Sequence, residues 1–255
     1  MSHLFDLKGR TAVVTGSSRG IGFALAEGLA KAGAKVILNG TSADTVAEAV
    51  AKLKAKDLDV LGRAFDVTDE VAVADAFAHW DSQNIQVDIL INNAGINVRN
   101  LLLDVELSEW QRVIDANLTS AFIVSKEAAK RMIARGKGGK IINLGSIASE
   151  AGRKSIGAYS AAKGGVKLLT RSMAAEWAAF NIQANAIGPG YILTEMNTAL
   201  IRNVEFDTWV KSTSPAQRWA QPEELVGTAL YLSSAASSYV NGQIIYVDGG
   251  WLAVL

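Results

Sequence analysis

The stretch TAVVTGSSRGIGFALAEGLAKAG, residues 11–33, decides the fold class of this chain. It joins a β-branched run at 11–15 to three glycines spaced G-x-x-x-G-x-G, and then to an Ala/Leu-rich segment typical of a helix. Glycines at such a turn let the backbone approach a pyrophosphate closely, and the following helix N-terminus offers free N–H groups to the phosphates. The strand before and the helix after therefore indicate a dinucleotide-binding loop, although the spacing differs from the general G-x-G-x-x-G pattern.

The same alternation of apolar runs and Ala/Leu-rich segments continues along the 255 residues. It predicts strands at 11–15, 35–38, 59–65, 88–91, 140–144, 182–187 and 243–247. Helices are predicted at 20–31, 42–55, 69–83, 106–135, 157–180 and 222–235. Because the apolar runs are nearly continuous, we expect parallel strands that are buried on both faces. The prediction is an α/β fold: a single domain over 1–255 with a Rossmann-type doubly wound sheet of about seven parallel strands flanked by helices.

The segment 191–221 differs from this alternation, because it is rich in aromatic and polar residues between the sixth strand and the last predicted helix. An insertion there lies beyond the carboxyl end of a strand, where open α/β sheets bind ligands. We expect it to cap the substrate, with Trp209 and Trp219 lining or packing the pocket.

Composition excludes several classes of function. The 25 basic and 25 acidic side chains balance, which gives no electrostatic footprint for nucleic acid or an anionic membrane. The absence of cysteine excludes disulfides and thiolate metal sites, and two histidines are too few for a His-rich metal site. No secretory signal or continuous apolar span is visible. We expect a cytoplasmic protein that has a small-molecule substrate and no metal.

The end of the second predicted strand indicates which dinucleotide binds. A carboxylate at that place would favour NAD through its ribose hydroxyls, but the sequence there is Leu38-Asn39-Gly40-Thr41-Ser42. Arg19 offers a guanidinium to a 2′-phosphate, and the hydroxyls of Thr41 and Ser42 add donors. NADP is therefore the predicted cofactor. NAD remains possible if Arg19 is only a solvated loop residue.

A second constellation lies further along the chain. Tyr159 and Lys163 stand four residues apart in YSAAK, on one face of a predicted helix, and Ser146 follows the strand before it. With the glycine loop and NNAG at 92–95, the chain resembles the short-chain dehydrogenase/reductase family over essentially its full length. The matching elements are TGSSRGIG, Asp66, NNAG, Asn117, Ser146, YSAAK, Pro189-Gly190 with Thr194, and DGG at 248–250.

The resemblance implies a role for each matching residue. Tyr159 would be the general acid/base, Ser146 would hydrogen-bond the substrate oxygen, Lys163 would hold the nicotinamide ribose, and Asn117 would anchor a water. We expect the Lys163 ammonium to lower the pKa of the Tyr159 phenol. The full set expected to contact the cofactor is Gly16, Ser18, Arg19, Gly20, Ile21, Asn39, Thr41, Ser42, Asp66, Val67, Asn93, Ala94, Gly95, Tyr159, Lys163, Pro189, Gly190, Ile192 and Thr194.

Several loops are similar to those of the branch of this family that interconverts gluconate and 5-ketogluconate, among them GINVRN, SIASEAGR and NAIGPGYILTEM. A sugar acid carries one carboxylate, which suits Arg99 or Arg153, and several hydroxyls, which suit Glu150. Together with Ser146 and Tyr159, these residues form the predicted substrate site. The alternative is that Arg99, Glu150 and Arg153 are exposed loop charges.

Two other functions use the same scaffold. One is reduction of a 3-oxoacyl-(acyl carrier protein) or another small ketone, and the other is a dinucleotide-sensing protein without turnover. The family resemblance also implies a homotetramer, with the apolar end at 251–255 in a subunit contact.

Overall fold

The computed structural model describes residues 2–254, so Met1 and Leu255, the outer bounds of the predicted domain, lie outside the described residues. Seven strands form one parallel sheet in the order β3-β2-β1-β4-β5-β6-β7, which confirms the predicted fold class. The strands are β1 (Thr11–Val14), β2 (Lys35–Gly40), β3 (Val60–Ala64), β4 (Ile89–Asn92), β5 (Gly139–Leu144), β6 (Ile182–Pro189) and β7 (Ile244–Val247).

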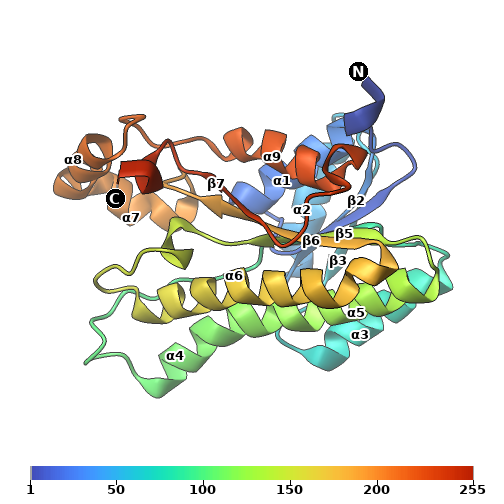
Figure 1. The fold of residues 1–255 in the computed structure, drawn as a ribbon, viewed down its shortest axis with the longest axis horizontal. Coiled ribbons are helices and arrows are strands. Elements are labelled where there is room, and N and C mark those ends of the chain that lie inside the picture. Colours follow the sequence, from blue (N-terminus) through green and yellow to red (C-terminus); the bar gives the residue numbers. More distant parts are fainter. Residues whose placement is uncertain (1, 255) are drawn as a thin grey trace.

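Helices cover both faces of this sheet (Figure 1). One layer holds α1 (Gly20–Lys31), α2 (Ala43–Lys54) and α9 (Val226–Ser233). The other holds α3 (Glu70–Ser82), α4 (Leu107–Ile114), α5 (Ser120–Ala134) and α6 (Gly157–Trp177). No helix in the described part of the chain combines the length and the apolar character needed to cross a membrane.

Alternating side chains of the central strands explain why both faces are covered. Val14 and Leu38 point into a core shared with α1 and α2, whereas Val13 and Ile37 point into a second core shared with α3 and α5. All four are fully buried. A parallel sheet with apolar side chains on both faces is stable only between two helical layers.

The helix predicted at 106–135 is interrupted. A π-helical turn, η2 (Asp115–Thr119), separates α4 from α5 and contains Asn117. Such turns insert an extra residue into a helix and occur often at functional sites. The apolar periodicity of the segment gave no sign of this turn.

The segment 191–221 leaves the end of β6 and contains two short helices, α7 (Thr198–Arg202) and α8 (Val204–Thr213), which lie at one end of the molecule (Figure 1). We call 191–221 the cap segment. The remaining short helical turns are η1 (Ser2–Phe5), η3 (Ile147–Ser149), η4 (Ala178–Phe180), η5 (Glu195–Asn197), η6 (Pro222–Leu225), η7 (Ala235–Ser237) and η8 (Trp251–Val254).

Candidate active site

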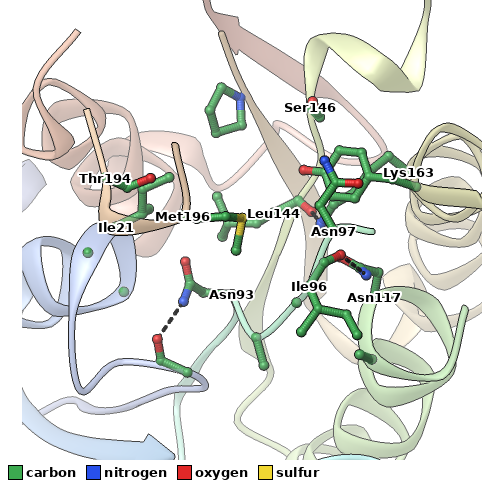
Figure 2. A pocket seen from close by; sticks show the side chains of 18 of the residues that line it. Ile21, Asn93, Ile96, Asn97, Asn117, Leu144, Ser146, Lys163, Thr194 and Met196 are labelled. Atoms are coloured by element: carbon green, nitrogen blue, oxygen red, sulfur yellow. Dashed lines mark hydrogen bonds between the residues drawn. The ribbon is translucent and has the colours of Figure 1, made fainter. Parts of the chain in front are cut away.

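A cleft of about 930 Å³ opens at the carboxyl edge of the sheet. Its walls come from the glycine loop, from the ends of β2, β4, β5 and β6, and from the cap segment. Figure 2 shows the cleft from close by, with Ile21 and Thr194 on one side and Ser146, Lys163 and Asn117 on the other. Open α/β sheets bind their ligands at this edge.

Buried polar side chains fix the glycine loop. The Thr15 hydroxyl accepts hydrogen bonds from the backbone N–H groups of Asn93 and Ala94, each at 3.0 Å. The Asn93 amide donates in return to the carbonyls of Thr15 and Gly16, each at 2.9 Å. The loop after β4 and the loop after β1 are therefore locked together, with Asn93 beside the glycine loop (Figure 2).

Packing around Gly16 and Gly22 leaves no room for a side chain at either position. A Cβ atom on Gly22 would lie 2.4 Å from the Asn93 amide nitrogen and 2.4 Å from the Gly16 carbonyl oxygen. Gly16 has φ +60°, and a Cβ there would lie 2.8 Å from the Ala94 backbone. No side chain caps the N-terminus of α1 at Arg19. A narrow, glycine-built turn with free helical N–H groups is well suited to the pyrophosphate of a dinucleotide.

The three residues predicted at the cofactor near the end of β2 differ in their contacts and in their exposure to the cleft. Asn39 is buried, and its side chain accepts from the Gly16 N–H (3.2 Å) and donates to the Phe65 carbonyl (3.1 Å). Its amide is thus committed to the protein itself, although Asn39 lines the cleft as predicted. Thr41 lines the cleft, whereas Ser42 caps α2 and lies outside the cleft lining.

Arg19 is exposed at the mouth of the cleft, and its Nη1 lies 3.4 Å from Glu195 Oε2 of the cap segment. Asp66 also lines the cleft, and its carboxylate accepts from the backbone N–H and the hydroxyl of Thr68. The other residues expected at the cofactor also line the cleft: Gly16, Ser18, Gly20, Ile21, Val67, Asn93, Ala94, Gly95, Tyr159, Lys163, Pro189, Gly190, Ile192 and Thr194.

The four residues predicted to be catalytic, Asn117, Ser146, Tyr159 and Lys163, lie together on one wall of the cleft. The Lys163 ammonium is 5.5 Å from the centre of the Tyr159 ring and donates to the Leu144 carbonyl at 2.6 Å. Ser146 begins η3, and its hydroxyl accepts from the Ala148 N–H at 3.1 Å.

Asn117 lies in the π-helical turn, which aims its side chain at the loop after β4. Its amide donates to the Ile96 carbonyl at 2.8 Å, as drawn in Figure 2, and to the Val113 carbonyl at 2.9 Å. Its buried Oδ1 has no hydrogen-bond partner within the described residues. A buried amide oxygen without a partner is suited to an ordered water.

Burial shifts the ionisation of both central groups. It raises the pKa of Tyr159, while a hydrogen bond with Ser146 and the positive charge of Arg99 oppose that rise. Burial lowers the pKa of Lys163 from 10.5 to about 8. We expected Lys163 to act on the phenol, but in the structure Arg99 supplies the neighbouring positive charge while the Lys163 ammonium is held by Leu144. Burial outweighs the charge, so the phenol of the ligand-free chain stays protonated at neutral pH.

The three charged residues of the predicted substrate site have different partners, and only two of them line the cleft. Arg99 lines the cleft, and its guanidinium has no hydrogen bond or ion pair with any described side chain. Arg153 lines the cleft too, but its guanidinium is packed among aromatic rings of the cap segment. Burial and the charge of Arg153 lower the pKa of Arg99.

Glu150 is not brought to the cleft lining. Its carboxylate pairs with Lys167 at 2.5 Å and accepts from the Tyr246 hydroxyl at 2.6 Å. These bonds lower the pKa of Glu150, with the Lys167 bond contributing most. The carboxylate therefore ties η3 to α6 and β7, and the expectation that it meets substrate hydroxyls has no support in its position.

Sequence reasoning missed two features of the site. The sequence predicts Thr15 only as the end of a strand, whereas its buried hydroxyl organises the loop after β4. The aromatic packing around Arg153 was also missed, apart from the expectation that Trp209 and Trp219 line or pack the pocket. Trp251 packs against Tyr191 and Trp209 of the same chain, so this part of the apolar end is buried within the subunit. No group of three or more metal-ligating side chains occurs in the chain between its two undescribed ends.

A nicotinamide-type cleft with this Asn, Ser, Tyr and Lys set defines a class of protein. The family model described as enoyl-(acyl carrier protein) reductase matches residues 16–252. The chain belongs to the short-chain dehydrogenase/reductase family.

Two curated relatives narrow the comparison. The chain is 47% identical over 255 residues to a 2-dehydro-3-deoxy-D-gluconate 5-dehydrogenase of Formosa agariphila, covering 99% of this chain and 96% of the relative. It is 46% identical over 252 residues to a gluconate 5-dehydrogenase of Gluconobacter oxydans, covering 98% of each.

Solved structures agree with these relatives. A putative gluconate dehydrogenase from Agrobacterium tumefaciens superposes with a TM-score of 0.98 at 60% identity, covering 99% of this chain and 100% of that one. A gluconate 5-dehydrogenase from Burkholderia cenocepacia, in complex with NADP and tartrate, gives a TM-score of 0.97 at 42% identity, covering 100% of this chain and 99% of that one.

Proposed function

We propose that this chain is an NADP-dependent oxidoreductase that interconverts D-gluconate and 5-keto-D-gluconate. One observation carries the proposal. Tyr159 and Ser146 lie in the same cleft as the guanidinium of Arg99, which has no partner among the described side chains. That arrangement serves a substrate that has both a reducible carbonyl and a carboxylate. The names of the relatives and solved neighbours support the same substrate class.

The cofactor part of the proposal rests on the fit of the glycine loop and its surroundings. The absence of a Cβ at Gly16 and Gly22 lets the loop pack tightly against Ala94 and Asn93, and Arg19 and Thr41 line the cleft where they can hold a 2′-phosphate. Four neighbours of known structure contain NADP, which supports the choice. When bound, the nicotinamide supplies or accepts the hydride.

Proton transfer is the task that we assign to the chain's own side chains. Since burial raises the pKa of Tyr159, its phenol carries a proton at neutral pH and donates it to the carbonyl oxygen in the direction of reduction. The Ser146 hydroxyl holds the same oxygen. Lys163 holds the ribose hydroxyls, and the unpartnered Oδ1 of Asn117 holds a water on the proton path. Oxidation needs the phenolate, so its rate rises with pH.

We assign the substrate carboxylate to Arg99. It is an unpaired arginine in the cleft wall, and a guanidinium binds a carboxylate through two parallel hydrogen bonds. The cap segment then covers the substrate, with Ile192, Thr194 and Met196 lining the same cleft. In this proposal residues 1–255 act as one domain, and 191–221 is its capping insertion.

A panel of ketones assayed with both cofactors tests the proposal. We expect turnover of 5-keto-D-gluconate with NADPH, weaker turnover with NADH, and little turnover of a 3-oxoacyl thioester. A second candidate substrate is 2-dehydro-3-deoxy-D-gluconate, because a 47% identical relative is named for it. Both acids carry a carboxylate, but the second is oxidised at C5, so its assay uses NADP⁺ and NAD⁺ in place of the reduced cofactors. Cofactor binding without turnover of any ketone would favour the sensing protein instead.

Two variants test the residue assignments. Arg99→Met should raise KM for the sugar acid by about tenfold or more, because a charge-assisted bidentate pair is lost. Arg19→Met should raise KM for NADPH by about tenfold and leave KM for NADH nearly unchanged. Equal effects on both cofactors would remove Arg19 from the 2′-phosphate site.

The assembly and the location complete the proposal. We propose a cytoplasmic homotetramer. Phe122 on α5 and Leu168 on α6 are exposed apolar side chains that suit contacts between copies. Light scattering on the purified protein measures the assembly, and a monomer would contradict it.

A further inference from the structure

We propose that Arg153 is a positioning residue that holds the cap segment over the cleft, and that it does not bind the substrate carboxylate. Its guanidinium acts as a cationic core for a set of aromatic rings contributed by distant parts of the chain. We call this set the aromatic box: Tyr191, Phe206, Trp209, Trp219 and Trp251. The kinetic part of this inference rests on the proposed function, whereas its ligand-free part does not.

The contacts of Arg153 show that its guanidinium is already engaged. Its Cζ atom lies 4.4 Å from the centre of the Phe206 ring, 4.8 Å from that of Trp209 and 5.8 Å from that of Tyr191. Its Nη1 donates to the Tyr191 hydroxyl at 3.0 Å. No carboxylate pairs with it among residues 2–254. Aromatic faces attract a cation most strongly where water is excluded.

The rings around Arg153 hold one another as well. Tyr191 makes edge contacts with four rings, and Trp209 lies 5.5 Å from Phe206 and 6.5 Å from Trp251, centre to centre. The Trp219 indole donates to Asp207 at 2.8 Å, so the far end of the cap segment is tied to α8. Edge-to-face aromatic pairs of this kind stabilise beyond the area that they bury.

The box joins three segments that border the cleft. Arg153 lies between η3, which Ser146 caps, and α6, which carries Tyr159. Phe206 and Trp209 lie on α8 of the cap segment, and Trp251 lies on η8 and lines the cleft. A guanidinium at their junction therefore fixes the position of the cap segment relative to the catalytic wall, and it does so before any ligand binds.

This role has a consequence for specificity. If Arg153 positions the cap segment, its loss weakens binding of every substrate that needs the cap, with or without a carboxylate. If it binds the carboxylate, its loss weakens binding of acids alone. In the first case the charge of Arg153 contributes to substrate affinity through the shape of the site, and Arg99 binds the substrate carboxylate.

Arg153→Met is the variant that separates these roles. Methionine keeps a long flexible apolar side chain against the rings but removes the cation and the donor. In the ligand-free protein we expect red-shifted tryptophan emission, because three of the six tryptophans belong to the box, and faster proteolytic cleavage within 198–213. We expect KM to rise by the same factor, about tenfold, for 5-keto-D-gluconate and for the neutral ketose D-fructose. The value of kcat should change by less than about twofold.

The opposite results overturn the inference. A rise in KM for the acid alone, with unchanged emission and proteolysis, would make Arg153 a carboxylate ligand. Unchanged emission, proteolysis and KM would make it a surface charge. If no sugar acid is turned over, the ligand-free measurements still decide, so failure of the proposed function is distinguishable from failure of this inference.

Two further variants serve as controls for Arg153→Met. Lys154→Met removes the neighbouring exposed positive charge and should leave emission, proteolysis and KM unchanged. Arg153→Lys keeps the charge but loses the planar stacking and fixed fork, so it should recover part of the loss. If Arg153→Met does not fold, Arg153→Lys carries the same measurements: a smaller but equal rise in both KM values supports the inference, and a rise for the acid alone overturns it.

Discussion

The glycine loop and the aromatic box border the same cleft, yet they are held in opposite ways. The loop is built from backbone and small polar side chains, and a single extra methyl at Gly22 would sit 2.4 Å from two polar atoms. The box is built from five large rings with contacting ring centres 5.5–6.5 Å apart, and three of these rings lie against one guanidinium. At the mouth of the cleft, Arg19 of the glycine loop pairs with Glu195 of the cap segment.

This difference suits the ligand on each side. A dinucleotide pyrophosphate needs backbone N–H groups at fixed positions. A glycine turn provides them, and its tight packing tolerates no added side chain. A substrate with several hydroxyls has to be covered after it enters, which large rings can do without a unique set of hydrogen bonds. We therefore expect substitutions in the glycine loop to abolish cofactor binding. Substitutions in the aromatic box should weaken substrate binding by degrees.

The largest effect on activity is expected at the catalytic wall, which lies between the glycine loop and the aromatic box. Tyr159→Phe removes the only group that we assign to proton donation, so kcat should fall by about 10²–10⁴. Fluorescence titration with NADPH should give an unchanged Kd, because the ring stays in place. Turnover at the wild-type rate would show that another group carries the proton.

The next effect tests the rigidity of the loop. Gly22→Ala forces a methyl against the Asn93 amide and the Gly16 carbonyl, so NADPH affinity should fall by about a hundredfold or the chain should lose about 1–3 kcal/mol of stability. The matched control is Gly227→Ala in α9, where a Cβ meets nothing within 4 Å and should stabilise the helix slightly. Wild-type NADPH binding and stability in the Gly22 variant would mean that the loop is more adaptable than its packing indicates.

The same contrast explains what the sequence could predict. The glycine loop, NNAG and YSAAK are contiguous motifs whose chemistry depends on residues a few positions apart, so the sheet, the cofactor cleft and the catalytic wall were all predicted. Arg153 and Trp251 both contact Tyr191 from positions almost a hundred residues apart, and no local periodicity links them. The inward turn of Asn39, the partners of Glu150 and the π-helical turn at Asn117 likewise depend on tertiary contacts.

The catalytic wall should show a third, pH-dependent effect. Burial lowers the pKa of Lys163 to about 8, while an unfolded chain would titrate near 10.5. Below about pH 8 the folded chain holds a buried cation, which is unfavourable by about 3 kcal/mol relative to an exposed one. Between about pH 8 and 10.5 the unfolded chain binds more protons than the folded chain, so stability rises with pH.

Lys163→Met tests that cost. At pH 7 the variant should be more stable than the wild type by about 1–2 kcal/mol, since the lost bond to the Leu144 carbonyl offsets part of the gain. Urea unfolding at pH 7 and pH 9.5 should show the difference shrinking at the higher pH. A variant that is less stable at pH 7, or a difference independent of pH, would mean that the ammonium is well solvated where it lies. Activity should be lost in either case.

The smallest effect is expected inside the aromatic box. Tyr191→Phe removes the oxygen that accepts the Arg153 hydrogen bond and keeps the ring with its four edge contacts. Because burial raises the pKa of Tyr191, the wild-type phenol stays neutral throughout the assay range and the comparison does not depend on pH. One hydrogen bond of this kind contributes about 1 kcal/mol, so KM for acid and neutral substrates should rise by about threefold to fivefold, with kcat unchanged.

Gly22→Ala adds one carbon to the loop and Tyr191→Phe removes one oxygen from the box. If the second change is as damaging as Arg153→Met, the box depends on its hydrogen bond more than on its rings, and its geometry is as strict as that of the loop.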